Sequence, residues 1–267
     1  MRLGTTTLSV TQPGRRRLLA VSGGGGSGGS GGGSGGSGGG SGGGSGSGFV
    51  TTNLIAHVDA GDTNSYGGTG TTWTDLTSSS NDFTLINGPV YSSSTDGGVF
   101  TFDGTNDRAE TSTTVSLSSD FSFDAWINTG SNSGTQTVFA IGNHDLTSGL
   151  KIEGGSTGGS NNRYYFMITT GNTLVYNGSL IYSPEWAHVA LVRSGSTVTV
   201  YLNKTAIATF TNSATLSGNL LLGASQVSTS SNYLFHLGGK ISNARLYDAA
   251  LSATEVTQNY DAFSGRF

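Results

Sequence analysis

Four glutamates, Glu110, Glu153, Glu185 and Glu255, are the first residues whose chemistry could be catalytic. Retaining glycoside hydrolases need two carboxyl groups about 5 Å apart, one acting as acid and the other as nucleophile. On a β-strand such a pair arises when two acids stand two residues apart, because alternate side chains share a face. None of the four glutamates has an aspartate at the second position after it. The sequence therefore predicts that the chain is not an enzyme.

The four histidines, His57, His144, His188 and His236, also lack the spacing of a metal or catalytic site. No two of them stand two or four residues apart, as paired ligands on a strand or helix would. His57 and His188 fall in predicted strands, where a packed and hydrogen-bonded imidazole is the simpler interpretation. Cysteine is absent, which excludes disulfides, thiolate metal sites and a cysteine nucleophile.

Clustered acids and amides make calcium the one cofactor to consider, because hard cations prefer carboxylate, amide and carbonyl oxygens. The alternative for each cluster is a turn in which the carboxylate accepts hydrogen bonds from nearby backbone N–H groups. The candidate ligands of a structural calcium are Asp59, Asp62, Asp75, Asp103, Asn106 and Asp107.

Aromatic residues beside amides, carboxylates or arginine have the chemistry of a carbohydrate site, since rings stack on sugar faces and polar groups pair with hydroxyls. A place in the core is the alternative for the aromatic candidates, above all for Trp73. Trp126 and Trp186 are expected in the core. The candidates for sugar contact are Tyr66, Trp73, His144, Asp145, Asn161, Asn162, Arg163 and Tyr164.

The chain divides into three segments of different composition: an arm (residues 1–22), a linker (23–48) and a head (49–267). The linker contains only Gly and Ser, which predicts a flexible coil with an r.m.s. span of roughly 26–30 Å. Four arginines and no acids give the arm a charge of +4, whereas the head has 8 basic and 16 acidic side chains. Because an acidic head repels a polyanion, nucleic acid is not an expected partner.

The arm is too short to bury a core of its own. It is either a disordered start or a docking peptide that binds a partner assembly, with Arg15, Arg16 and Arg17 as its basic contacts. No run reaches the 18 apolar residues that a membrane-spanning helix needs. The apolar patch at 18–21 is also too short for a secretory signal.

From Phe49 onward, short β-branched and aromatic runs are separated by Gly, Asn, Ser and Asp clusters, which is typical of short antiparallel strands. The pattern predicts thirteen strands packed as a two-sheet antiparallel jelly-roll sandwich, an all-β fold. In the strand at 121–127, alternation places Phe121 and Phe123 on one face and Asp124 and Trp126 on the other. One helix is expected at 252–260.

That helix has Ser252 at its N-cap and Glu255 three residues later, the spacing of a capping box.

Several stretches of the head, taken in order along the chain, carry the sequence pattern of a known family. They are Asn53 to Gly61, Trp73 to Leu76, Phe102 to Asp107, Phe121 to Ile127, Trp186 to Arg193 and Ile241 to Ser252.

On these stretches the chain resembles the laminin-G-like domains of the concanavalin A-like lectin/glucanase superfamily. The final residues, Thr257 to Phe267, also resemble the tails of such domains in bacteriophage structural proteins and bacterial surface proteins. The resemblance implies a sandwich that binds glycans, with calcium in loops at one edge. It also implies display on a virion surface, in many copies and held by the arm, with an extracellular or cell-surface setting as the alternative. A structural decoration or cement protein that binds neighbouring subunits and no sugar is the second hypothesis for function.

Overall fold

The computed structural model describes residues 48–130, 134–142, 150–156, 163–170, 173–182, 185–227 and 232–267. The chain forms two units, Met1–Gly43 and Gly44–Phe267, and every described residue belongs to the second. The predicted docking residues Arg15, Arg16 and Arg17 lie outside the described part of the chain.

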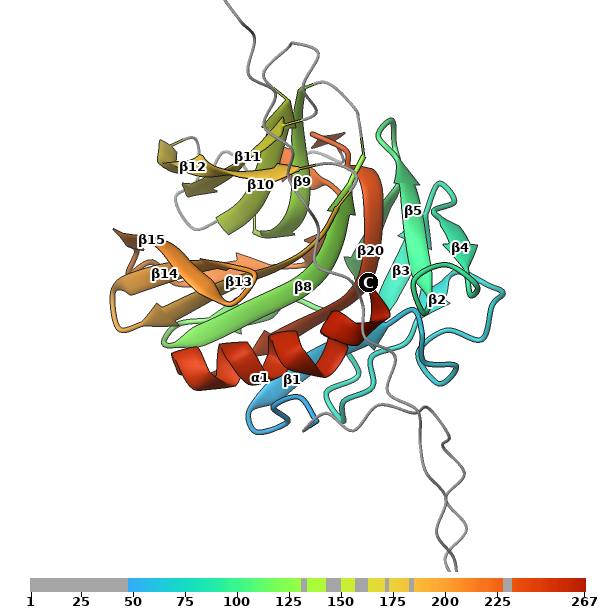
Figure 1. Ribbon diagram of the computed structural model, residues 1–267, viewed down its shortest axis with the longest axis horizontal. Helices are drawn as coiled ribbons and strands as arrows, with labels where there is room; N and C mark the ends of the chain where they lie inside the picture. Colours follow the sequence, from blue (N-terminus) through green and yellow to red (C-terminus); the bar gives the residue numbers. More distant parts are fainter. Residues whose placement is uncertain are drawn as a thin grey trace, which may run out of the picture. The chain divides into compact units, whose positions relative to one another are not determined.

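Two eight-stranded sheets, A and B, form the body of the head (Figure 1). Sheet A runs in the order β15 (Thr205–Thr211), β14 (Thr197–Leu202), β13 (Trp186–Ser194), β8 (Phe121–Thr129), β20 (Gly238–Tyr247), β5 (Val99–Asp103) and β4 (Val90–Ser92), with β1 (Leu54–Asp59) also paired to β20. Sheet B runs in the order β12 (Thr173–Tyr182), β11 (Arg163–Thr170), β10 (Leu150–Ser156), β9 (Gly134–Ile141), β17 (Leu220–Leu222), β6 (Arg108–Thr111), β3 (Phe83–Ile86) and β2 (Thr72–Trp73).

Two short ribbons, β7 (Val115–Leu117) with β16 (Leu216–Gly218) and β18 (Ser225–Val227) with β19 (Asn232–Leu234), complete the strands. Each pairing among the described strands is antiparallel. The predicted all-β, two-sheet sandwich is confirmed. All thirteen predicted strands are present, whereas β2, β4, β6, β7, β16, β18 and β19 were not predicted.

Alternation along β8 explains how the two sheets meet. Phe121 and Phe123 belong to the apolar core between the sheets, and the Phe123 ring stacks on Phe139 of β9 with centroids 3.9 Å apart. The other face of β8 is buried as well, although it carries Asp124 and Trp126. Because both faces of β8 are buried, a further layer must cover this outer face.

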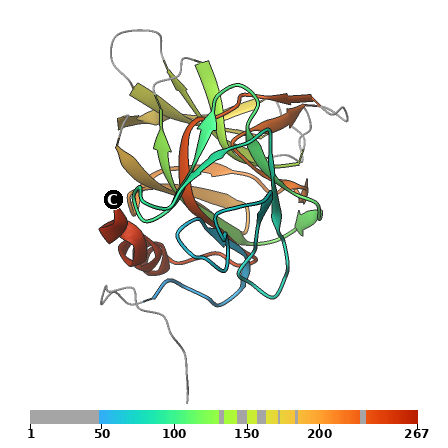
Figure 2. The ribbon, with the colours of Figure 1, turned by 90° about the vertical axis from the view of Figure 1, so that its right-hand side faces the viewer.

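The covering layer is the helix α1 (Ala253–Phe263), which lies against the outer face of sheet A (Figures 1 and 2). Its N-cap Ser252 and Glu255 form the predicted capping box. Val256 of α1 packs with Val192 of β13 in a second apolar cluster that is separate from the core between the sheets. The head therefore has three layers: sheet B, sheet A and α1.

A buried polar network joins sheet A to α1. The Asp124 carboxylate accepts hydrogen bonds from Arg245 Nε and Asn259 Nδ2, each at 2.7 Å, and lies 3.5 Å from Nε2 of His188. Burial raises the pKa of Asp124, but the charge of Arg245 and the contact with His188 outweigh it and hold that pKa well below its usual range. The Asn259 side chain also accepts a 2.8 Å bond from Val50 N–H, so the network fixes the start of the head.

Just before β5, the fold requires a glycine, Gly98, because there is no room for a side chain. Gly98 has φ +106°, and a Cβ there would lie 2.4 Å from the Cα of Gly61. Gly70 has a similar φ of +95° but open space around it. We expect Gly70→Ala to cost about 1–2 kcal/mol of unfolding free energy through backbone strain, and Gly98→Ala to cost a further 1–3 kcal/mol or so through the clash. Urea denaturation of the two variants checks this, and equal losses would contradict the close approach.

Candidate functional site

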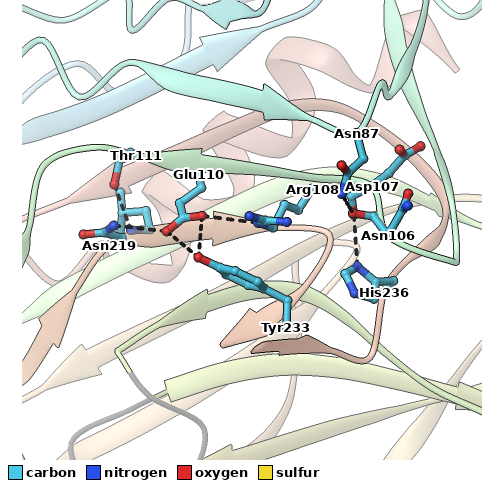
Figure 3. Close-up of polar contacts among 10 residues, drawn as sticks. Asn87, Asn106, Asp107, Arg108, Glu110, Thr111, Asn219, Tyr233 and His236 are labelled. Atoms are coloured by element: carbon cyan, nitrogen blue, oxygen red, sulfur yellow. Dashed lines mark hydrogen bonds and ion pairs between the residues drawn. The ribbon is translucent and has the colours of Figure 1, made fainter. Parts of the chain in front are cut away.

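A groove of about 380 Å³ opens on the outer face of sheet B, beside the β18–β19 ribbon (Figure 3). Its floor comes from β6, where Ala109 faces the core and Arg108 and Glu110 therefore face outward. The lining residues are Asn87, Asn106, Arg108, Asn232, Tyr233, Leu234 and His236.

The Glu110 carboxylate organises one wall of this groove (Figure 3). It accepts hydrogen bonds from Arg108 Nε at 3.2 Å, from Asn219 Nδ2 at 3.1 Å and from the Tyr233 hydroxyl at 2.9 and 3.1 Å. The guanidinium carbon of Arg108 also lies 3.6 Å from the centre of the Tyr233 ring, a cation–π contact. These contacts fix β6, β17 and the β18–β19 ribbon relative to one another.

Tyr233 acts in this wall as a neutral hydrogen-bond donor. Burial raises the pKa of its phenol, and the hydrogen bond to Glu110 and the charge of that residue raise it further, against a smaller opposite effect of Arg108. The phenol is therefore protonated at neutral pH. Its single O–H hydrogen is shared between the two oxygens of Glu110.

The opposite rim of the groove is a tight turn between β5 and β6. Oδ1 of Asp103 accepts hydrogen bonds from the N–H groups of Thr105, Asn106 and Asp107 at 2.8, 3.1 and 3.3 Å. Burial raises the pKa of Asp103, but these three bonds outweigh it and the net shift is downward. The turn also directs two carbonyls toward the groove: that of Asn106 accepts from Asn87 Nδ2 at 2.8 Å, and that of Asp107 lies 3.3 Å from His236 Nδ1.

Amides, an imidazole, a guanidinium and a phenol thus surround a space of small-ligand size. Such groups pair with hydroxyls and amides, and the half-exposed Leu234 adds an apolar contact. No carboxylate is among the described residues that line the groove, and Glu110, which holds one wall, has both oxygens hydrogen-bonded. The arrangement suits binding of a polar ligand.

A comparison of the sequence with protein-family models identifies the family to which the chain belongs. The model described as the concanavalin A-like lectin/glucanases superfamily, of the laminin G type, matches residues 102–257. The chain belongs to this superfamily. The match covers more than half of the chain and contains each groove residue except Asn87. Its fold is that of lectin-like binding domains.

Solved structures show the same fold at low sequence identity. A sialidase of Trypanosoma rangeli in complex with sialic acid is 14% identical, with a TM-score of 0.61 over 82% of this chain and 34% of that chain. Domain 4 of AbnA, a GH43 extracellular arabinanase from Geobacillus stearothermophilus, in complex with arabinotriose, is 18% identical, with a TM-score of 0.57 over 78% of this chain and 98% of that one.

The binding domain of botulinum neurotoxin serotype G is a third structure of this shape, 14% identical, with a TM-score of 0.52 over 78% of this chain and 50% of that chain. This chain spans about a third of the length of the sialidase chains that it matches. A search of curated proteins gives no match. Among the described residues, no helix has the length and apolar character needed to cross a membrane.

The predicted calcium ligands of this superfamily member have other partners. The two oxygens of Asp75 accept from the N–H groups of His57 and Asn81 and from the N–H and hydroxyl of Thr77. Those of Asp59 each lie 2.7 Å from a terminal nitrogen of Arg266. Both carboxylates are thus occupied by hydrogen-bond donors, which compete with a cation.

The remaining candidates do not complete a calcium site either. Oδ1 of Asp62 accepts from the backbone and side chain of Asn64, and Asp103 and Asp107 hold the turn that carries Asn106. No three acids or histidines within the described residues come close enough to share a metal ion. The acids of these clusters accept hydrogen bonds, as the alternative interpretation expects, and calcium binding at any one of the clusters stays a prediction.

Two of the predicted sugar-contacting aromatics are core residues. Trp73 is fully buried, with its ring centre 4.7 Å from that of Phe100. Tyr66 is 6% exposed, packs against the same Phe100 ring at 4.8 Å and donates its hydroxyl to the Gly70 carbonyl. Neither ring reaches the surface as a platform, because the apolar core between the sheets needs their area.

The other two tryptophans differ in burial. Trp126 is buried as expected, whereas Trp186 is only partly buried. The Trp186 ring stacks on Phe267 at 4.3 Å, and its Nε1 donates to Asp96 at 3.0 Å. The expectation of a core position holds for the first alone.

The structure does not describe the side chains of the remaining sugar-contact candidates. His144, Asp145, Asn161 and Asn162 lie outside the described residues. Arg163 and Tyr164 belong to β11, of which the backbone is described and the side chains are not. Their roles stay predictions.

Of all the predicted site residues, Asn106 alone lines the groove. The others in the groove come from short segments that carry no motif, and the wall depends on Glu110, which was considered only as a catalytic acid. One local signal was present: Asn87-Gly88 is a turn dipeptide, and both residues have positive φ in the structure. That signal predicts a turn but gives no indication of a binding role.

Proposed function

We propose that the head is a non-catalytic, lectin-like domain that binds glycans in the groove of sheet B. The observation that carries this proposal is the groove itself, a preformed space lined by amides and by a stacked Arg108–Tyr233 pair that Glu110 holds in place. Preorganised polar groups around a small apolar contact are what recognition of hydroxyl-rich ligands requires.

The groove chemistry supports binding without hydrolysis. Glycoside hydrolysis by two carboxylates needs one free acid and one free base or nucleophile at the bond. Glu110 is held by three donors, and the raised pKa of Tyr233 keeps its phenol neutral and thus a weak nucleophile. These residues are better suited to holding the groove in shape than to proton transfer.

The proposed setting is a virion surface or fibre, with an extracellular or cell surface as the alternative. In this proposal the basic arm, through Arg15, Arg16 and Arg17, docks on the particle, and the Gly/Ser linker presents many heads for weak, multivalent contact with host glycans. The position of Val50 supports this, because it is held under α1 on the outer face of sheet A, whereas the groove opens on sheet B. A bound glycan would face away from the point where the linker ends.

The alternative function is a decoration or cement subunit that binds neighbouring proteins and no sugar. The two are separated by which part of the chain sediments with the particle: residues 1–48 under the display proposal, residues 49–267 under the decoration proposal. If the full chain bound no glycan on an array and the head bound the particle, the decoration proposal would be favoured.

The direct test is glycan-array and equilibrium binding by the full chain and by Arg108→Ala. We expect the substitution to weaken binding of the best glycan by about tenfold or more, because it removes a charged donor and the stacking partner of Tyr233. Lys204→Ala is the matched control. Lys204 also pairs with an acid, Asp261 at 2.9 Å, and lies over the Tyr260 ring of α1, away from the groove. Equal losses in the two variants would rule out the groove as the site.

A further inference from the structure

We infer that the groove ligand is an uncharged sugar that carries a methyl group, either an N-acetylated or a 6-deoxy sugar. This inference rests on the proposed function and names the ligand class of the same groove. It follows from the charges around the groove and from one exposed leucine.

The charge of Arg108 is already compensated. Its Nε donates to Glu110 at 3.2 Å, so the guanidinium reaches the groove as one half of an ion pair. A carboxylate or sulfate on a sugar would have to compete with Glu110 for it. Hydroxyl and carbonyl oxygens can accept from the terminal nitrogens without disturbing that pair.

Further acids stand around the same rim. Asp103 and Asp107 belong to the turn that carries Asn106, and both interact electrostatically with the groove residue His236. The lowered pKa of Asp103 keeps it ionised at neutral pH. Burial raises the pKa of Asp107, so Asp103 is the acid whose charge repels an anionic ligand at this rim.

Uncharged donors and acceptors dominate what remains of the lining. Three amide side chains, Asn87, Asn106 and Asn232, border the groove. An amide presents both a donor and an acceptor, which matches hydroxyl pairs and the acetamido group of an N-acetylated sugar.

Leu234 supplies the apolar part of the site. It is 45% exposed, and Val90, at 65%, is the other large exposed apolar side chain among the described residues. Leu234 borders the groove next to Tyr233, whose bond to Glu110 fixes this strand, whereas Val90 lies on β4 at the edge of sheet A. An exposed leucine beside polar groups is suited to covering a methyl group of a ligand.

The test compares binding of the full chain to albumin conjugates of matched sugars. N-acetylglucosamine, N-acetylgalactosamine, 6-deoxyglucose and 6-deoxygalactose carry the methyl group, glucose and galactose are their counterparts without it, and glucuronate and galacturonate carry a charge. We expect at least one methyl-bearing conjugate to bind about fourfold or more tightly than its unsubstituted counterpart, the value of one buried methyl group. The hexuronates should bind more weakly than the hexoses, and the N-acetyl and 6-deoxy arms distinguish the two sources of the methyl group.

Two variants tie the preference to the groove. Leu234→Ser should abolish the advantage of the methyl-bearing conjugate, and Val90→Ser, which removes the other large exposed apolar side chain among the described residues, should preserve it. Tighter binding of hexuronates, or an advantage that survives Leu234→Ser, would overturn the inference while leaving glycan binding intact. Failure of every conjugate and of every array glycan to bind would overturn the proposed function, and the inference with it.

Discussion

Replacing Arg245 with methionine is expected to lower the unfolding free energy of the head by about 3–5 kcal/mol. The reason is that the charged partner, Asp124, would remain buried without Arg245. Asp124 is 1% exposed, and its Oδ1 would lose the 2.7 Å bond from Arg245 Nε. A carboxylate left in the interior without its opposite charge is far more costly than the loss of an exposed pair. Urea denaturation followed by tryptophan fluorescence measures the change.

Two further variants give this prediction its control. Asp124→Leu combined with Arg245→Met removes both charges, so it should recover much of the lost stability, because an apolar pair of similar volume leaves no buried charge. Lys204→Ala removes an exposed pair whose side chains are 42% and 52% exposed, and should cost under about 1 kcal/mol. A cost for Arg245→Met no larger than that for Lys204→Ala would contradict a structural role for the buried pair.

The same pair links fold and function. Asp124 lies on β8 and Arg245 on β20, and Asn259 of α1 connects the pair to Val50. The network therefore stabilises the place where the linker ends, on the side of the sandwich away from the groove. In the display proposal, a force applied through the linker would act first on Val50 and the Asp124–Arg245–Asn259 network at sheet A, and not on the groove of sheet B.

The fold could be predicted because its signals are local. The period-two alternation of β8 identified Phe121 and Phe123 as core residues, and the spacing of Ser252 and Glu255 identified the start of α1. Each of these patterns lies within a few residues, and each reflects a constraint that the local backbone imposes on its own side chains.

The groove could not be predicted because its parts meet only through strand pairing. Asn87, Glu110 and Tyr233 are far apart in the sequence and come together through β3, β6 and the β18–β19 ribbon. All four strands have only three or four residues, and three of them, β6, β18 and β19, carry no clear pattern. Residue type alone also pointed to Trp73 as a sugar contact, although the area of its ring is buried in the core.

His57 makes the stability of the head depend on pH. The pKa of this imidazole is lowered from 6.5 to about 4, chiefly by burial and also by the charge of Arg245, against the smaller opposite effects of Asp59, Asp124 and Asp75. In the unfolded chain the imidazole takes up a proton near pH 6.5. Between about pH 6.5 and 4 the unfolded state therefore binds more protons than the folded state, and the folded head loses stability as pH falls.

We expect this one histidine to account for a loss of about 3 kcal/mol in unfolding free energy between pH 7 and pH 4, since each pKa unit corresponds to about 1.4 kcal/mol. The stabilising effect is complete above pH 6.5 and is lost once pH passes below the folded pKa. His57→Gln keeps a polar side chain that does not titrate, so urea denaturation from pH 7 to pH 4 should show a much flatter profile in the variant. Carboxylates of lowered pKa, such as Asp124, act below about pH 4 and leave this window unaffected. Parallel profiles for the variant and the unaltered chain would show that His57 is accessible to protons in the folded state, and that the contacts around β1 are looser than their burial indicates.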